Sequence, residues 1–303
     1  MSATTAFAFL VGLVALGNLL GRLRVLPAES SNVLNQVVLN VCLPAAILLY
    51  APQLQFSVEI AAVAAVPWLL FALATALVFG VGHWLGWDVR TRWLLVLAIA
   101  LGNTSFLGYP LSEALLGVEA LPWAVVYDQF GTFVLMSTVG VAILARVSGG
   151  DVSAAAMARR VLGFPPFIAL VVALTLMPDS YPLAITQILG TLAGALLPLV
   201  ALAIGVSLRL RLPRDQVGPL AFGLAGKLLL LPLASWPLAW LLGIEGVAFD
   251  TVVLESAMPT MITAMVLASA AGLDSRLASA LAGYGIVLSA LSLPLWAWAL
   301  QSF

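Results

Sequence analysis

The chain has 303 residues, of which 63% are hydrophobic and only 8% are charged, and its formal net charge is −1. Its mean hydropathy of +1.15 means more apolar surface than one soluble core could bury, which excludes an ordinary soluble domain. The charge balance gives no indication of nucleic-acid binding, and the single cysteine, Cys42, excludes a disulfide within the chain. We therefore expect an all-α polytopic membrane protein.

Ten apolar segments follow one another with short connections between them. Because a membrane helix needs about 20 residues to cross the hydrocarbon core, each segment is long enough to span. The first lacks a preceding basic region and a following cleavage site, so we interpret it as a retained helix. The expected helices are 4–20, 31–51, 58–83, 92–117, 121–145, 157–177, 183–208, 217–242, 247–271 and 275–301.

The basic residues test this arrangement independently. If the N-terminus is outside, eleven of the twelve basic residues fall in connections on one side, and the twelfth, Lys227, lies within a predicted helix. This asymmetry follows the positive-inside rule and predicts a multi-pass protein of a cytoplasmic membrane with both termini outside. The eleven are Arg22, Arg24, Arg90, Arg92, Arg146, Arg159, Arg160, Arg209, Arg211, Arg214 and Arg276.

The ten helices divide into two sets of five, 1–150 and 151–303, joined by the arginine-bearing stretch from Arg146 to Arg160. Prolines recur at matching places in the two sets, and an odd number of helices per repeat inserts the second copy upside down. Inverted repeats place a substrate site near the midplane, where broken helices meet. The alternative is that the prolines only kink their helices. The matching pairs are Pro44 with Pro198 and Pro110 with Pro259.

The fourth predicted helix is interrupted by polar residues, glycine and proline over 102–110. Such a break frees backbone groups that hydrocarbon cannot satisfy, so it survives only where it lines a protein cavity. A half-helix beginning there would direct N–H groups and its positive dipole end at the gap, which predicts an anionic substrate. The alternative is a capped kink. The expected substrate contacts are Asn103, Thr104, Ser105, Gly108 and Pro110, with Asn40 and Pro44 from the second helix.

A second break, Glu255 to Thr260, interrupts the ninth predicted helix, and Pro259, Thr260 and Thr263 complete the expected substrate site. An ionisable residue inside a membrane segment is costly enough to be a functional candidate by default. Glu255 would either coordinate a cation such as Na⁺ with unwound carbonyls or exchange a proton. Its alternative is a carboxylate at an aqueous mouth.

Asp128, in the fifth predicted helix, is the second such carboxylate, and inversion would bring it to a cation site shared with Glu255. The alternative places Asp128 in an aqueous vestibule. Lys227 could pair with an acid or an anionic substrate, or extend its long stem to the headgroups. The expected set for Na⁺ or proton coupling is Asp128, Gln129, Glu255, Ser256 and Met258, with Lys227 as a charge partner.

These motifs together resemble the auxin efflux carrier family over nearly the whole chain. The similarity is carried by GNTSFLGYPL at 102–111, LNVCLP at 39–44 and AMP at 257–259. The resemblance implies ten helices in two inverted repeats that cross at the prolines of helices four and nine. It also implies an elevator-type movement of a transport domain against a scaffold to which helices two and seven contribute, with the substrate carboxylate near Asn103. The short connection 147–158 replaces the long loop of the best-known plant members, which favours a bacterial carrier.

A more distant resemblance to the bile acid sodium symporters rests on Glu255, four residues before Pro259, and implies sodium coupling. We therefore expect a secondary transporter of a small organic anion, either an auxin-like carboxylate or a dicarboxylate, coupled to Na⁺ or H⁺ and without a cofactor. The expected partners are this anion and the lipid bilayer, with a homodimer left open. The alternatives are an uncoupled anion uniporter, a bile-acid-type symporter, a channel and an intramembrane enzyme, although the sequence lacks a nucleophile with its base.

Overall fold

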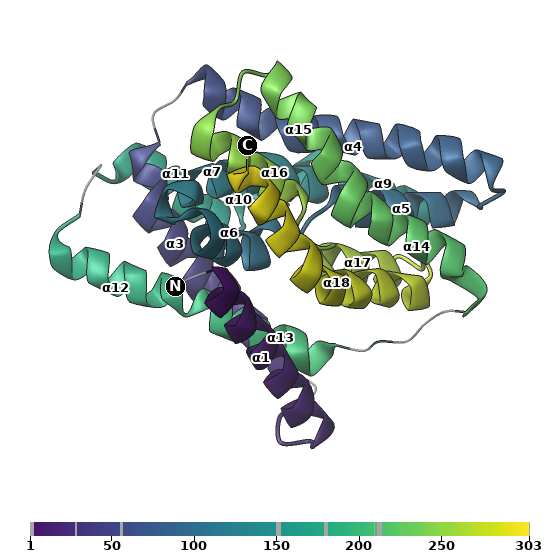
Figure 1. Cartoon of the computed structure of the whole chain (residues 1–303), viewed down its shortest axis with the longest axis horizontal. Coiled ribbons are helices and arrows are strands. Elements are labelled where there is room, and N and C mark those ends of the chain that lie inside the picture. Colours follow the sequence, from purple (N-terminus) through teal and green to yellow (C-terminus); the bar gives the residue numbers. More distant parts are fainter. Residues whose placement is uncertain are drawn as a thin grey trace.

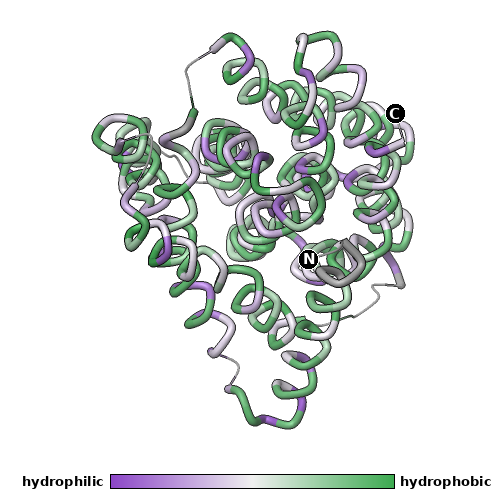
Figure 2. The backbone as a smooth tube through the Cα atoms, turned by 60° about the vertical axis from the view of Figure 1, so that its left-hand side comes forward, coloured by the Kyte–Doolittle hydropathy of each residue, from purple (hydrophilic) through white to green (hydrophobic). Residues whose placement is uncertain are grey.

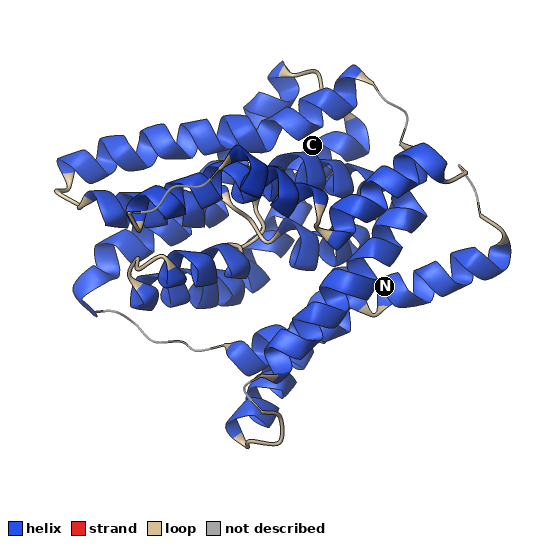
Figure 3. Ribbon diagram, turned by 180° about the vertical axis from the view of Figure 1, so that it is seen from behind, coloured by secondary structure: helices blue, strands red, loops and turns tan. Residues whose placement is uncertain are grey.

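The computed structural model describes residues 3–27, 29–54, 57–149, 153–178, 181–208, 210 and 214–302. In this part of the chain every regular element is a helix (Figure 3). The structure therefore agrees with the all-α class that the composition predicts. Arg209 and Arg211, which belong to the predicted charge pattern, lie outside the described residues.

The elements of the first half include four π-helical turns, η1, η3, η5 and η6, each of which continues directly into an α-helix. In chain order they are α1 (Ala3–Arg22), α2 (Ser30–Val37), η1 (Val38–Cys42), α3 (Leu43–Tyr50), η2 (Ala51–Gln53), α4 (Val58–Trp84), α5 (Val89–Ala100), η3 (Thr104–Gly108), α6 (Tyr109–Leu116), η4 (Val118–Ala120), α7 (Leu121–Val126), η5 (Tyr127–Thr132), α8 (Phe133–Leu135), η6 (Met136–Gly140) and α9 (Val141–Val147).

The second half adds one more π-helical turn, η8. Its elements are α10 (Ala154–Leu162), α11 (Pro165–Leu176), α12 (Leu183–Gly194), α13 (Leu196–Ser207), η7 (Arg214–Gln216), α14 (Val217–Ala225), η8 (Gly226–Leu230), α15 (Leu231–Leu241), α16 (Gly246–Ser256), α17 (Ile262–Ala270) and α18 (Ser275–Gln301).

Six helical runs of the described chain are long and apolar enough to cross a membrane, and hydrophobic colouring covers most of the helical tube in Figure 2. The protein is therefore a multi-pass membrane protein. The six runs are Ser30–Tyr50, Val58–Trp84, Val118–Val147, Leu183–Ser207, Val217–Leu241 and Ser275–Gln301.

The fourth and ninth predicted helices are absent from that group because each is broken near its middle. The helices α5 and α16 have 12 and 11 residues, and at about 1.5 Å per residue each covers little more than half of a hydrocarbon core of about 30 Å. The sixth predicted helix, 157–177, is also two helices, because the pair Pro165-Pro166 begins α11 anew and leaves α10 as a separate amphipathic helix.

The two breaks cross each other and pair through their backbones. Gly102 and Thr260 form an antiparallel bridge. Beside it, Asn103 N donates to Pro259 O at 2.7 Å and Met261 N donates to Leu101 O at 2.9 Å. We call this pairing, between residues 101–103 and 259–261, the crossing. It gives hydrogen-bond partners to backbone that could not otherwise remain at this depth.

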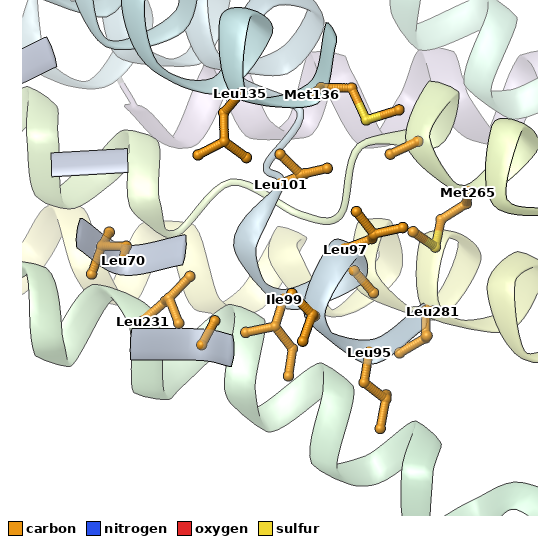
Figure 4. Packing of buried hydrophobic residues seen from close by; sticks show 14 of the residues in the cluster. Leu70, Leu95, Leu97, Ile99, Leu101, Leu135, Met136, Leu231, Met265 and Leu281 are labelled. Carbon is orange, nitrogen blue, oxygen red and sulfur yellow. The ribbon is translucent and has the colours of Figure 1, made fainter. Parts of the chain in front are cut away.

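The crossing lies between two hydrophobic clusters. One surrounds α5, whose consecutive residues Leu94 to Ile99 are all fully buried. Figure 4 shows side chains of α5, including Leu97 and Ile99, among apolar side chains of other helices. The second cluster joins α1, α3, α7, α11 and α13 with the ends of α16 and α18. In the first broken helix, α5 lies in the first cluster and α6 in the second, whereas in the second broken helix α16 contributes to both clusters and α17 to the first.

Two glycines bring α1 and α13 into close contact, and in Figure 1 this pair extends away from the rest of the bundle. A Cβ added at Gly17 would lie 2.6 Å from Leu202 O, and one added at Gly205 would overlap Val14 O. The Asn18 amide donates to the carbonyls of Gly205 and Leu208, both at 3.2 Å. Small residues with an interhelical amide are the usual basis of such packing within lipid.

Arginine side chains tie several connections together at one end of the bundle. Arg90 donates to Val147 O at 3.2 Å and to Gly272 O at 2.6 Å, and Arg276 pairs with Asp215 at 2.9 Å. Asp274 caps α18 beside these arginines. Burial acts to raise the pKa of Asp274, but hydrogen bonds from Leu277, Gln216 and Arg276 outweigh burial, so this pKa lies below its ordinary value. We call this end of the bundle the arginine end.

We predict that Gly17→Ala destabilises the protein by about 1–3 kcal/mol, because its Cβ must push apart two packed backbones. Gly12→Ala, on the same helix, is the matched control, since a Cβ there meets nothing within 4 Å. That control should be neutral or slightly stabilising, because alanine is the better helix former. Thermal unfolding in detergent measures both, and equal melting temperatures for the two variants would contradict the close packing.

Candidate functional site

A cavity of about 180 Å³ lies beside the crossing. It is mostly apolar and has four polar lining residues, Asn103, Ser105, Ser137 and Thr263. Three of the predicted substrate contacts, Asn103, Ser105 and Thr263, line it. We call it the crossing cavity. Its remaining lining residues are Leu39, Phe106, Phe133, Met136, Ser137, Phe164, Met261 and Leu267.

Both half-helices that leave the crossing begin at this cavity. One is η3 with α6, which starts at Thr104, and the other is α17, which starts at Ile262. The first turn of a helix leaves N–H groups without intrahelical acceptors and carries the positive end of the helix dipole. The Nδ2 of Asn103 is buried and has no hydrogen-bond partner, although Asn103 is 5% exposed and lines the cavity. Asn103 and the two helix N-termini are therefore the candidate donors for an anion at this cavity.

Asp128 lies behind the cavity wall and accepts four hydrogen bonds. Its carboxylate is fully buried and receives the hydroxyls of Thr104, Ser105 at 2.6 Å and Tyr109 at 3.0 Å, together with the Gln129 amide at 2.7 Å. A carboxylate with four donors is well suited to remain charged away from water. Ser105 belongs to both features, since it lines the cavity and donates to Asp128.

Glu255 is the second buried carboxylate at the crossing, and only one of its oxygens is satisfied. Its Oε1 accepts from Ser112 Oγ at 2.9 Å, while Oε2 is buried without a partner. The carboxylate lies against the backbone of Gly108, where an added Cβ would overlap it. Asp128 and Glu255 repel each other, so the two acids form one electrostatic unit. This partnerless oxygen is a candidate acceptor for a proton or a ligand for a cation.

Lys227 enters the same region from α14–α15 and is fully enclosed, at 2% exposed. Its Nζ donates to Ser256 O at 2.9 Å, and it attracts Glu255 across the crossing. The side chain of Lys227 therefore does not extend to the lipid headgroups, which was the alternative to its being a buried charge partner. The hydroxyl of Ser256 bonds to Val253 O at 2.7 Å and to Ser235 at 2.8 Å.

Three π-helical turns place these polar side chains. Thr104 and Ser105 lie in η3, Asp128 and Gln129 in η5, and Lys227 in η8. A π-helical turn inserts an extra residue into an α-helix and is frequent at functional sites. In η5 the turn is held against α4, because Gly131 leaves just enough room for the Pro67 ring. Side chains on both flanks of the turn thus face the interior.

The model of a family described as "Membrane transport protein" matches residues 2–297. The chain belongs to this family, that of the auxin efflux carriers. It is therefore a transporter and not an enzyme.

Three relatives align over most of the carrier. It is 32% identical to an uncharacterized transporter of Methanothermobacter thermautotrophicus, over 98% of each chain. It is 26% identical to an uncharacterized transporter of Methanocaldococcus jannaschii, over 91% of this chain and 92% of the relative. It is 28% identical to a protein of Rhizobium meliloti named "Putative malonate transporter", over 89% of this chain and 87% of the relative.

The other predicted site residues of this auxin efflux carrier family member lie outside the cavity lining. Asn40 is exposed and donates to Gln36 O at 2.8 Å, and Pro44 is half-buried. Thr260 donates to Ala98 O at 2.9 Å, so it joins the second break to α5. Gly108, Pro110, Met258 and Pro259 are buried, and of these four only Pro259 belongs to the crossing.

Several residues of the site had not been singled out in the sequence. Tyr109 and Ser112 are donors to the two acids, and Ser235 is bonded to Ser256. Tyr109 and Ser112 follow Ser105 by four and seven residues, which is one face of a helix, so helical spacing could have indicated them. Phe133 directly follows η5 and Ser137 lies in η6, and no sequence pattern marks such π-helical turns.

We predict that Gly108→Ala destabilises the carrier by about 1–3 kcal/mol, because its Cβ displaces the Glu255 carboxylate. Gly80→Ala on α4 is the control, since a Cβ there meets nothing within 4 Å. In the Gly108→Ala, Glu255→Ala double variant the losses in melting temperature should be less than additive, since removing the carboxylate removes the clash. Strict additivity would mean that the two residues do not press on each other.

Proposed function

We propose that the protein is a secondary carrier of a small organic anion, a carboxylate or dicarboxylate, and that the crossing cavity is its binding site. The observation that carries this proposal is the orphaned amide of Asn103 in a cavity where two half-helices begin. Membership of a transporter family supports transport, and the name of the Rhizobium meliloti relative supports a short dicarboxylate such as malonate.

The size and lining of the cavity favour a small solute. At about 180 Å³ it is below the range of about 300–1,000 Å³ that holds drug-sized ligands. The polar groups Asn103, Ser105 and Thr263 would bind the carboxylate oxygens, and the helix N-termini would stabilise their charge. Phe106, Phe133 and Phe164 would then cover the remaining part of the substrate.

Asp128 and Glu255 are the proposed carriers of a coupling cation, either Na⁺ or H⁺, with Gln129, Ser256 and Met258 around them. Two buried carboxylates and one buried ammonium leave one negative charge uncompensated when all three are ionised. A buried charge without compensation is costly, so uptake of one cation would neutralise the unit. The partnerless Oε2 of Glu255 supports this role.

We further propose ten membrane spans in two inverted repeats, 1–150 and 151–303, in a cytoplasmic membrane with the arginine end inside. The crossed breaks support the repeat, and the shared location of Arg90 and Arg276 with their partners supports the orientation. An elevator-type movement would carry the crossing relative to a scaffold that includes the α1 and α13 pair. A second cavity of about 360 Å³ separates α13 from α17 and α18, which supports independent movement of these parts.

Carboxylate binding can be tested with purified protein. A thermal-shift screen of short mono- and dicarboxylates should identify a stabilising ligand, because ligand at 100 times its Kd adds about 2.7 kcal/mol to the native state. Proteoliposomes should take up the same acid saturably and with trans-stimulation. Asn103→Ala should weaken binding by about 10- to 100-fold, since a hydrogen bond to a charged group is lost. Asn32→Ala, at an exposed asparagine of α2, should leave it unchanged.

Other outcomes would assign the protein differently. Uptake that does not saturate would indicate a channel, and a chemically altered product without flux would indicate an enzyme. Equal affinity of the wild type and Asn103→Ala for every acid would move the binding site away from the crossing cavity.

Coupling is tested separately with Glu255→Gln and Asp128→Asn. Each substitution keeps the size of the side chain and removes the charge that a cation would neutralise, so each should abolish the dependence of uptake on the cation gradient. The measurement is uptake by proteoliposomes under imposed pH and sodium gradients. Variants that retain the full, unaltered gradient dependence would exclude these acids, and a wild type that responds to neither gradient would be a uniporter.

A further inference from the structure

Two helix C-termini meet at the crossing. The helix α5 ends at Ala100 and α16 ends at Ser256. The last carbonyls of a helix lack intrahelical donors and carry the negative end of the dipole, so they attract a cation. In broken-helix transporters such C-terminal ends and unwound carbonyls are where a coupling Na⁺ is held.

In this protein a side chain of the chain itself occupies that position. The Nζ of Lys227 donates to Ser256 O, at the end of α16. It also lies beside the first residue of the other break, because a Cβ added at Gly102 would be 3.1 Å from Nζ. Lys227 is the only lysine in the sequence, and every other basic residue is arginine. An ammonium is compact, as a cation between two helix ends must be.

The surrounding residues are arranged to admit this ammonium. Gly226 lets η8 approach α5 closely, since a Cβ there would lie 2.7 Å from Ile99 Cδ1. Trp296 Nε1 donates to Leu228 O at 2.9 Å, a carbonyl within the π-helical turn η8. Gly102 leaves the space into which Nζ extends. The position of Lys227 is thus fixed from three elements.

We propose that the Lys227 ammonium is a covalently tethered cation that takes the place of a bound sodium ion at the crossing, so that this carrier works without sodium. The proposal rests on the proposed carrier function and narrows its coupling ion. Sodium at the helix ends would need the Ser256 carbonyl that Lys227 already uses. The described residues also hold no cluster of three or more acidic, histidine or cysteine side chains that could replace it. The negative charge of Glu255 also attracts the Lys227 ammonium.

The first experiment uses the wild-type carrier in sodium chloride and in choline chloride at equal ionic strength. Uptake of the carboxylate found in the screen, and the melting temperature in detergent, should be the same in both salts, with uptake differing by less than about twofold. A stimulation by sodium of about tenfold, or a rise in melting temperature with sodium alone, would overturn the proposal.

The second experiment removes the tethered charge. Lys227→Ala should lower uptake in choline chloride by at least about tenfold and lower the melting temperature, because the helix ends lose their cation. Sodium or ethylammonium should restore both quantities, since each can enter the space that the side chain leaves. Asn103→Ala is the matched control: its uptake is also reduced, but neither cation should restore it. Failure of both cations to restore a folded Lys227→Ala protein would overturn the proposal.

A third variant keeps the test informative if Lys227→Ala does not fold. Lys227→Met fills the same volume without charge, so it should fold, lose uptake and remain inactive with ethylammonium because no space is left. Full uptake by Lys227→Met would overturn the need for a cation there. The melting-temperature measurements need no substrate, so they test the role of Lys227 even if no carboxylate is transported. Absence of transport by the wild type is the result that would count against the carrier function.

Discussion

The rest of the site depends on the backbone pairing between the two breaks. Broken helices leave N–H and C=O groups that lipid cannot satisfy, and here each break supplies the partners of the other, through the Gly102–Thr260 bridge and the Asn103–Pro259 and Met261–Leu101 hydrogen bonds. Neither break could persist alone at this depth. The paired breaks therefore form one unit, and Asp128, Glu255 and Lys227 are hydrogen-bonded in or next to it.

The crossing also separates charge. Helices that end there place negative dipole ends beside Lys227, and helices that begin there place positive ends beside the crossing cavity. A protein interior has no water to reorganise around a charge, so fixed dipoles of this kind stabilise ions that would otherwise be costly to bury. Of the two buried acids, Asp128 accepts from Ser105, which lines the cavity, and Glu255 attracts Lys227.

Much of this could be predicted from sequence because glycine, proline and buried charges are conspicuous in an apolar chain. The breaks at Gly102 and Pro259 followed from backbone chemistry alone, and the cost of burying Asp128 marked it as a candidate. The π-helical turns could not be predicted, since they depend on tertiary contacts such as Pro67 against Gly131. For the same reason Asn40, which is close to Pro44 in sequence, was expected at the site, whereas the π-helical turn η1 leaves it exposed and turns Leu39 toward the cavity.

The hydroxyl of Ser105 has a consequence for how anion and cation are linked. A serine has one proton to donate, and Ser105 gives it to Asp128 while its oxygen borders the cavity. Under the proposed function, a carboxylate in the cavity would compete for that proton, since it too can only accept. If the serine hydroxyl turned toward this anion, Asp128 would keep three donors instead of four and would hold a cation more tightly. Binding of the anion would then affect binding of the cation through rotation about a single bond.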